Sequence, residues 1–192
     1  NGSRGNISEL SPTPSPSSNV HSDEADHDAE QSKKYIADLN SALPPDIDSL
    51  SPAQVEDQIM LRSDIAVNLS AAWTRGTSLD REETSGIIST SVDALLSLTK
   101  YPSLIDNSTT TRSMGLLENM LARASWMRLT LNTATISGAA NVTSDLAQSP
   151  AVMSTAAGVR NVKAVVELIG EVLLLTVVVD GPQKTLACAG FS

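Results

Sequence analysis

The sequence predicts a mainly α fold, an antiparallel bundle of about five helices followed by a C-terminal β-strand that begins a further subdomain. Hydrophobic residues make up 41% of the 192 residues, but aromatic residues make up only 3%. The core must therefore consist of aliphatic side chains, which suits packed helices better than a β-sandwich. Apolar residues also recur at three- to four-residue spacing. Ser-Pro pairs, which are typical of helix starts, precede two of these stretches.

Residues 1–30 are predicted to form a disordered linker ahead of the bundle. "SPTPSPSS" alternates Ser or Thr with Pro, and an acidic run, "HSDEADHDAE", follows it. Proline prevents helix formation, and the polar residues offer little apolar surface to bury. The Ser-Pro repeats are also similar to the glycomodules of plant and green-algal wall glycoproteins, in which proline is hydroxylated and carries sugar. Under that interpretation Pro12, Pro14 and Pro16 are modified; an ordinary linker is the other interpretation.

The bundle is predicted to occupy residues 31–180, beginning with a short amphipathic helix in "EQSKKYIADLN" that Pro44-Pro45 closes. A second helix begins at Ser51-Pro52, where Ser caps the free backbone N–H groups and Pro fits the first helical position. Gly76 ends this helix. Its predicted inner face consists of Val55, Ile59, Ala66, Leu69 and Trp73.

The third and fourth predicted helices form a hairpin. Asp80 and Glu83 have the spacing of a capping box at the start of the third helix, and Pro102 stops it. The fourth helix is expected over residues 108–131. The predicted inner faces are Ile87, Ile88, Val92, Leu95 and Leu96 on the third helix, and Leu117, Leu121, Ala124 and Met127 or Arg128 on the fourth.

A long fifth helix is predicted after Ser149-Pro150, which repeats the cap signal. Residues 172–179, "VLLLTVVV", contain too many apolar residues in succession for a one-sided surface helix. We therefore expect the first half of this stretch to finish the helix at the centre of the bundle, covered on most sides. The predicted inner face is Val159, Val162, Val166, Ile169 and Leu173.

The segment after Asp180-Gly181-Pro182, "QKTLACAGF", alternates and is predicted to be a strand, so that residues 181–192 begin a β-subdomain. An unpaired strand would leave backbone donors and acceptors bare, so its partner is expected outside these residues. The apolar run at residues 164–179 is interrupted by two glutamates and is shorter than the roughly 20 residues that a bilayer requires. We therefore predict no membrane span.

The net charge and the titratable residues indicate neither nucleic-acid binding nor a catalytic site. The net charge is −9 without a Lys/Arg cluster, which argues against a nucleic-acid partner. His21 and His27 lie in the predicted linker, so neither a Ser-His-Asp nor a Cys-His arrangement can form in the predicted bundle. Glu82-Glu83 is interpreted as helix-start charge, and Glu167 with Glu171 as the polar edge of a helix. The sequence therefore predicts no catalytic residue, no cofactor and no metal site.

The tryptophans and the cysteine are interpreted as structural residues. The two tryptophans, Trp73 and Trp126, are interpreted as core or interface packing. Cys188 is the single cysteine, and it is either a disulfide candidate with a partner elsewhere or a buried free thiol.

Five sequons fit the N-glycosylation acceptor pattern, more than the Asn, Ser and Thr content predicts by chance. They favour a secreted or surface protein. The acceptors are Asn1, Asn6, Asn68, Asn107 and Asn141.

Residues 79–124 carry a resemblance to a known family. "LLSLTKYPSLI" (residues 95–105), a polar turn that bears a sequon, and "GLLENML" (residues 115–121) resemble the helical part of the REJ and GAIN-type regions of polycystins and adhesion receptors. The similarity extends over residues 52–192 or so. It implies a GAIN-A-like bundle that leads into the first strand of a β-subdomain. It also makes residues 98–109, "LTKYPSLIDNST", the elbow of a helical hairpin, a hinge in a scaffold.

The resemblance implies a non-enzymatic structural or interaction module of a large extracellular glycoprotein at the cell or ciliary surface. The Ser-Pro repeats would fit a green-algal polycystin-like component of flagellar hairs (mastigonemes). The expected partners are other domains of the same long chain, neighbouring extracellular proteins and glycans. Two alternatives stay open: an intracellular helical adaptor with accidental sequons, and the extracellular fragment of a self-cleaving adhesion-type receptor.

Overall fold

The computed structural model describes residues 19–76 and 79–180 and shows a mainly helical protein. Within these ranges the chain forms six long helices and one short one. They are α1 (Asn19–Ser41), α2 (Pro52–Arg75), α3 (Arg81–Thr99), α4 (Asn107–Trp126), α5 (Thr133–Ala147), α6 (Pro150–Met153) and α7 (Ala156–Asp180), with 3₁₀ turns at Ile47–Ser49 and Pro102–Leu104. No helix in the described ranges is long and apolar enough to cross a membrane.

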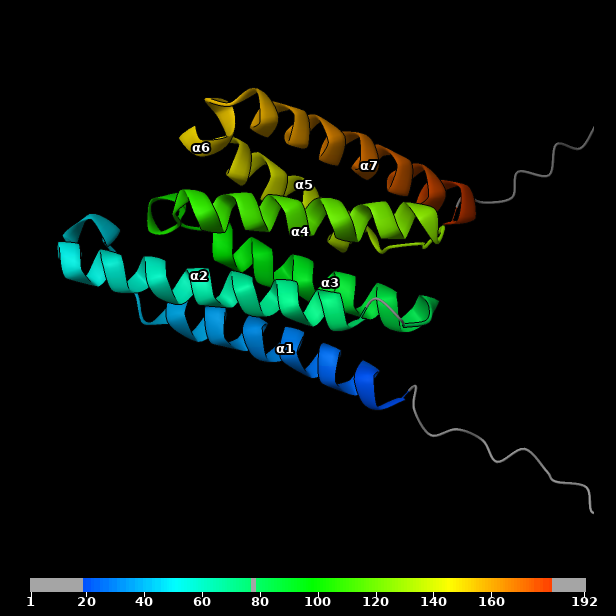
Figure 1. Ribbon diagram of the computed structural model, residues 1–192, viewed down its shortest axis with the longest axis horizontal. Helices are drawn as coiled ribbons and strands as arrows, with labels where there is room; N and C mark the ends of the chain where they lie inside the picture. Colours follow the sequence, from blue (N-terminus) through cyan, green and yellow to red (C-terminus); the bar gives the residue numbers. More distant parts are fainter. Residues whose placement is uncertain (1–18, 77–78, 181–192) are drawn as a thin grey trace, which may run out of the picture.

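The helices stack in layers, and successive long helices run in opposite directions (Figure 1). α1 lies at one end and packs on α2 and α3. α2 then packs on α4, and α3 packs on α5. α7 lies at the other end and packs on α4 and α5. α1 and α7 are therefore the two end helices of the stack.

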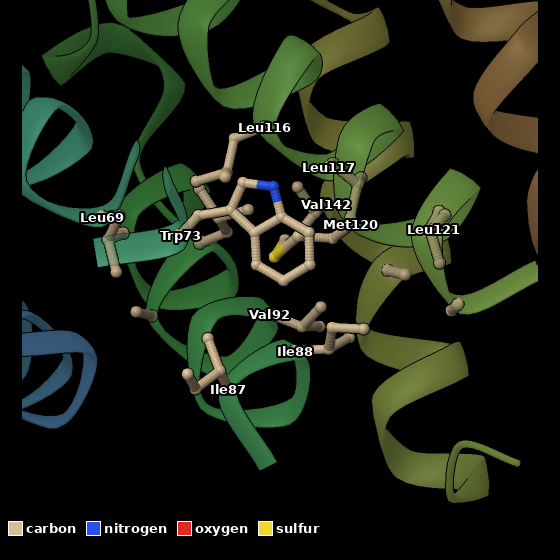
Figure 2. Packing of buried hydrophobic residues seen from close by; sticks show 14 of the residues in the cluster. Leu69, Trp73, Ile87, Ile88, Val92, Leu116, Leu117, Met120, Leu121 and Val142 are labelled. Carbon is tan, nitrogen blue, oxygen red and sulfur yellow. The ribbon is translucent and has the colours of Figure 1, made fainter. Parts of the chain in front are cut away.

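The core lies between the middle layers and is aliphatic, as the composition predicts. Trp73 of α2 is its largest aromatic side chain and is only 7% exposed. Figure 2 shows its indole between Ile88 and Val92 of α3 and Leu117 and Met120 of α4. The interpretation of Trp73 as packing is confirmed, whereas Trp126 is 79% exposed and belongs to no core of this chain.

The predicted start signals of α2 and α3 are confirmed. Ser51 accepts a hydrogen bond from the Gln54 N–H, and the Gln54 side chain accepts one from the Ser51 N–H. Asp80 and Glu83 make the same reciprocal pair at the start of α3. These bonds satisfy backbone N–H groups that a helix start leaves without partners. Gly76 caps the end of α2, as predicted.

The prediction of a disordered linker over residues 1–30 is wrong for residues 19–30, which form the first half of α1. Ala25, Ala29, Ser32 and Ile36 recur at spacings of four, three and four residues and are all buried. Small side chains bury little apolar area each, so composition hides this face, but they allow α1 to lie close to α2 and α3. His27 is exposed on this helix rather than in a linker.

The prediction of one helix over residues 108–131 is also wrong at its end. α4 stops at Trp126 because Arg128 adopts a left-handed conformation with φ 51°. The Leu129 N–H then donates to the Ala124 carbonyl at 2.9 Å, which closes a Schellman-type end. Arg128 is exposed, so it is not an inward residue of α4.

The five-helix prediction omits α5. Asn132 caps it by accepting a hydrogen bond from the Thr135 N–H at 2.7 Å. Its Thr, Ser, Gly and Ala content lowers both apolar character and helix propensity. Gly138 lies against α3, where an added Cβ would approach the Val92 side chain to 2.9 Å. The buried positions nevertheless follow helical spacing: Thr135, Ile136, Gly138, Ala139, Val142, Thr143 and Leu146.

α7 differs from the predicted fifth helix in its start and in its inner face. Ser149-Pro150 begins the short α6, and α7 follows it. Val165, Val172 and Thr176 form the buried face, whereas the predicted inner residues Val159, Val166 and Leu173 are 47%, 55% and 43% exposed. The stretch from residue 172 is therefore not covered on most sides, because α7 is an end helix with neighbours on one side. The predicted strand lies outside the described residues.

Candidate functional site: the acceptor asparagines and the outer face of α7

The three predicted glycan acceptors within the described ranges are all exposed. Asn68 lies on α2, Asn107 begins α4, and Asn141 lies on α5. Asn68 and Asn141 are each followed by a residue that the helix buries, Leu69 and Val142, so the helical rotation directs these two acceptor positions outward. The remaining predicted modification sites lie outside the described residues: Asn1, Asn6, Pro12, Pro14, Pro16 and Cys188.

The elbow before Asn107 is a fixed structure. α3 ends at Thr99, a 3₁₀ turn begins at Pro102, and the side chain of Leu104 in this turn is buried. Asp106 caps α4 by accepting a hydrogen bond from the Thr109 N–H at 2.7 Å. Partial burial acts to raise the pKa of Asp106, but the hydrogen bonds with Thr109 outweigh it and hold that pKa below its usual value. The predicted helical hairpin is confirmed.

A groove of about 380 Å³ separates α1 from α2 and contains Asn68. Tyr35 lines it from α1 and is half exposed. An ion pair between Arg75 and Asp28 lies at the same groove. A sugar on Asn68 would therefore emerge beside an aromatic ring and a charged pair.

A continuous apolar stripe runs along the outer face of α7. Val159, Val166 and Leu173 are spaced seven residues apart, and Val177 follows four residues later. Two helical turns take about seven residues, so the four side chains lie on one line. Val177 is 58% exposed, like the others. We call these four residues the α7 stripe.

The two flanks of the α7 stripe differ. On one side an apolar groove of about 260 Å³ separates α7 from α5 and is lined by Val162, Val166 and Ile169 of α7. On the other side lies a row of four charged residues. These are Arg160, Lys163, Glu167 and Glu171.

The charged row makes few contacts with its own chain. Lys163 Nζ lies 3.7 Å from Glu167 Oε1 in an exposed pair within one helical turn. Glu171 Oε2 accepts a hydrogen bond from Ser125 Oγ at 2.7 Å. The interpretation of the two glutamates as the polar edge of a helix is thus confirmed. Glu83 serves as a helix-start partner of Asp80, also as predicted.

Sequence reasoning missed the buried Arg62. It occupies a core position of α2, seven residues after Val55 and seven before Leu69, and is fully buried. Its Nη2 donates to Asn40 Oδ1 at 2.7 Å, and its guanidinium lies 6.0 Å from the centre of the Tyr101 ring. Burial lowers the pKa of Arg62 to about 10. The sequence does contain a signal for this burial, because Arg62 falls within the apolar face of α2.

Arg62 connects three segments of the chain. Asn40 lies in the last turn of α1, Arg62 lies on α2, and Tyr101 belongs to the elbow. Asn40 also donates from Nδ2 to the Ser97 carbonyl at 2.8 Å. In the part of the chain that the structure describes, no group of three or more His, Cys, Asp or Glu residues could hold a metal ion.

Comparison with known proteins gives no match: no protein-family model, no curated protein and no solved structure matches the chain.

Proposed function

We propose that the chain is a non-enzymatic, N-glycosylated helical module of a large extracellular glycoprotein at the cell or ciliary surface. The observation that carries this proposal is the exposure of Asn68, Asn107 and Asn141 on three different helices. Buried acceptors would have made the sequons accidental, because a folded core cannot hold a sugar.

The proposal includes a REJ or GAIN-type region of a polycystin-like protein, for example a mastigoneme component. α3, the elbow and α4 cover residues 81–126 and contain the segment that carries this resemblance. In this proposal the bundle corresponds to the GAIN-A-like part, and residues 181–192 begin the β-subdomain. The module packs against other domains of its own chain and against neighbouring extracellular proteins.

Mass measurement tests the glycosylation directly. We expect protein from the native source, cut with a protease and treated with an enzyme that removes N-glycans, to show Asn-to-Asp conversion at Asn68, Asn107 and Asn141. Asn119 is the internal control, because it is exposed on α4 without a sequon. Unmodified asparagine at all three acceptors would contradict the proposal.

An intracellular helical adaptor is the second candidate function. The α7 stripe favours it, because an exposed apolar helix face suits a protein-binding module and needs no sugar. The same mass measurement distinguishes the two candidate functions, since an intracellular adaptor would carry no glycan on any of the acceptors.

A further inference from the structure

The α7 stripe is an unpartnered surface with a regular spacing. Val159, Val166 and Leu173 repeat at seven residues, which is the spacing by which one helix packs along another. Gly170 lies beside this line and is exposed, and a Cβ added there would meet nothing within 4 Å. A glycine at this position lets another helix come close to α7.

The charged row beside the stripe is ordered by sign. Arg160 and Lys163 lie toward the start of α7, and Glu167 and Glu171 lie toward its end. Two copies of α7 related by a parallel two-fold axis would place their charged rows on opposite sides of the interface, where the rows do not meet. Two copies placed antiparallel set positive charges opposite negative ones, which favours association.

We propose that the outer face of α7 docks a second copy of this chain, whose own α7 packs against it antiparallel with Val166 near the two-fold axis. A two-fold interface brings the same patch of both copies together. With Val166 opposite itself, Val159 lies opposite Leu173 of the second copy.

The charged row agrees with that alignment to within two residues. Lys163 comes two residues from the position opposite Glu167 of the second copy, and Arg160 comes one residue from the position opposite Glu171, both within reach of long side chains. Because the charged row lies on one side of the stripe, the two-fold rotation places both rows on the same side of the interface, where they face each other.

The predicted dimer does not depend on sugars. Asn68 lies on α2, which is in a different layer from α7, whereas Asn107 begins α4 and Asn141 lies on α5, the two helices on which α7 packs. One helix face is small beside the roughly 800 Å² per partner of a standard interface. We therefore expect a reversible dimer whose population rises with concentration.

Sedimentation velocity on the full chain over a range of concentrations tests the association. We expect a monomer–dimer equilibrium, and Val166→Glu should raise the dissociation constant roughly tenfold or more, because it places two carboxylates at the axis. Val67→Glu is the matched control, since Val67 is an exposed valine on α2, and it should leave the constant unchanged. A chain that is monomeric at all concentrations, or a dimer that tolerates Val166→Glu, overturns the proposal.

Disulfide trapping tests the position of the axis. Cys188 is the single cysteine, so Cys188→Ser provides a background without other thiols. Val166→Cys in that background should form a covalent dimer under mild oxidation, whereas Val67→Cys should not. Equal cross-linking of both variants would mean random collision and would overturn the assignment.

Charge exchange tests the antiparallel direction. Lys163→Glu sets like charges opposite each other twice in the dimer and should raise the dissociation constant about fivefold. Lys163→Glu combined with Glu167→Lys restores opposite signs across the axis and should recover the association. Failure of the double variant to recover it overturns the antiparallel arrangement.

Deletion of residues 181–192 tests whether the face is free. If the deletion turns a monomeric chain into a dimer, that segment covers the outer face of α7 and the proposal is wrong.

Discussion

α1 and α7 are the two end helices of the same stack, yet they meet the solvent in opposite ways. α1 buries a narrow row of small residues and joins α3 through polar contacts. Lys33 pairs with Asp93 at 2.9 Å, and Glu30 accepts a hydrogen bond from Thr90 at 3.0 Å. The charged residues exposed on the described part of α1 are mainly acidic. α7 buries an aliphatic face and presents the aliphatic α7 stripe on its outer side.

The difference teaches that an end helix can either close a stack or leave it open. A mainly polar outer face, as on α1, gives a further layer little apolar surface to bury. α7 has more apolar surface than its contact with α4 and α5 uses. Exposed apolar stripes of this kind mark interaction sites in soluble proteins. α1 therefore closes the stack, and α7 is the end at which it can continue.

The largest expected difference in the free energy of unfolding is between truncation of a buried side chain of α1 and truncation of an exposed side chain of α7. Ile36→Ala should lower the free energy of unfolding by about 2–5 kcal/mol, because Ile36 is fully buried and its truncation leaves a cavity. Leu174→Ala should change it by less than about 0.5 kcal/mol, because Leu174 is 67% exposed. Urea denaturation at low protein concentration measures both. Equal losses would show that the outer face of α7 is covered within one chain.

Two glycines of α7 should respond in opposite directions. A Cβ at Gly158 would overlap with the backbone of Val152 in α6, so Gly158→Ala should cost about 1–3 kcal/mol. Gly170 has open space around it, so Gly170→Ala should stabilise the monomer by about 0.8–1 kcal/mol through helix propensity alone. Thermal unfolding followed by circular dichroism compares them. A destabilising Gly170→Ala in the monomer would contradict the open face.

The polar attachment of α1 should be weak and dependent on pH. The hydrogen bond with Asp93 raises the pKa of Lys33 above its ordinary 10.5. The contribution of Lys33 to stability is then fully present below pH 10.5 and is lost as the pH rises through the higher folded-state pKa. Lys33→Met should cost about 0.2–1 kcal/mol at neutral pH, less in high salt.

Lys163→Met on α7 is the control for this effect, because Lys163 pairs only within its own helix at 3.7 Å among the described contacts. It should cost about 0.3–0.5 kcal/mol at most. A Lys33 effect that persists in strongly alkaline solution would argue against the contact between α1 and α3. Denaturation curves at several pH values and salt concentrations provide the measurement.

The smallest expected effect concerns the two tryptophans. Trp126→Phe should leave the free energy of unfolding within about 0.5 kcal/mol of the original, because the Trp126 side chain is mostly in solvent. It should remove the part of the fluorescence that acrylamide quenches readily, since the remaining Trp73 is buried. Readily quenched fluorescence that persists in Trp126→Phe would place Trp73 at the surface.

Much of the fold could be read from the sequence where the interactions are local. Ser51 and Asp80 bond backbone groups two or three residues away, so their roles follow from spacing alone. The elbow between α3 and α4 was found in the same way, from Pro102 and the polar turn. α5 was missed because small and hydroxyl-bearing residues interrupt the aliphatic residues of its buried face, although the spacing of that face is helical. The acidic half of α1 was missed for the same reason.

The features of the candidate site also differ in whether local sequence or tertiary contacts determine them. Asn68, Asn107 and Asn141 were found as acceptors because a sequon is three consecutive residues. Their exposure, by contrast, depends on which face each helix buries. The burial of Arg62 also depends on distant residues, since Asn40 and Tyr101 reach it from other segments.

The sequence by itself determined where α2, α3 and α4 begin, which residues can carry sugar, and that the core is aliphatic. These properties depend on side chains and backbone within a few residues of each other. Only the tertiary structure decided that α1 and α7 are the ends of the stack and that the α7 stripe faces solvent. An apolar helix looks the same in sequence whether one layer or two cover it, because the covering residues lie far away in the chain. The number of layers that pack on it sets the exposure of each face.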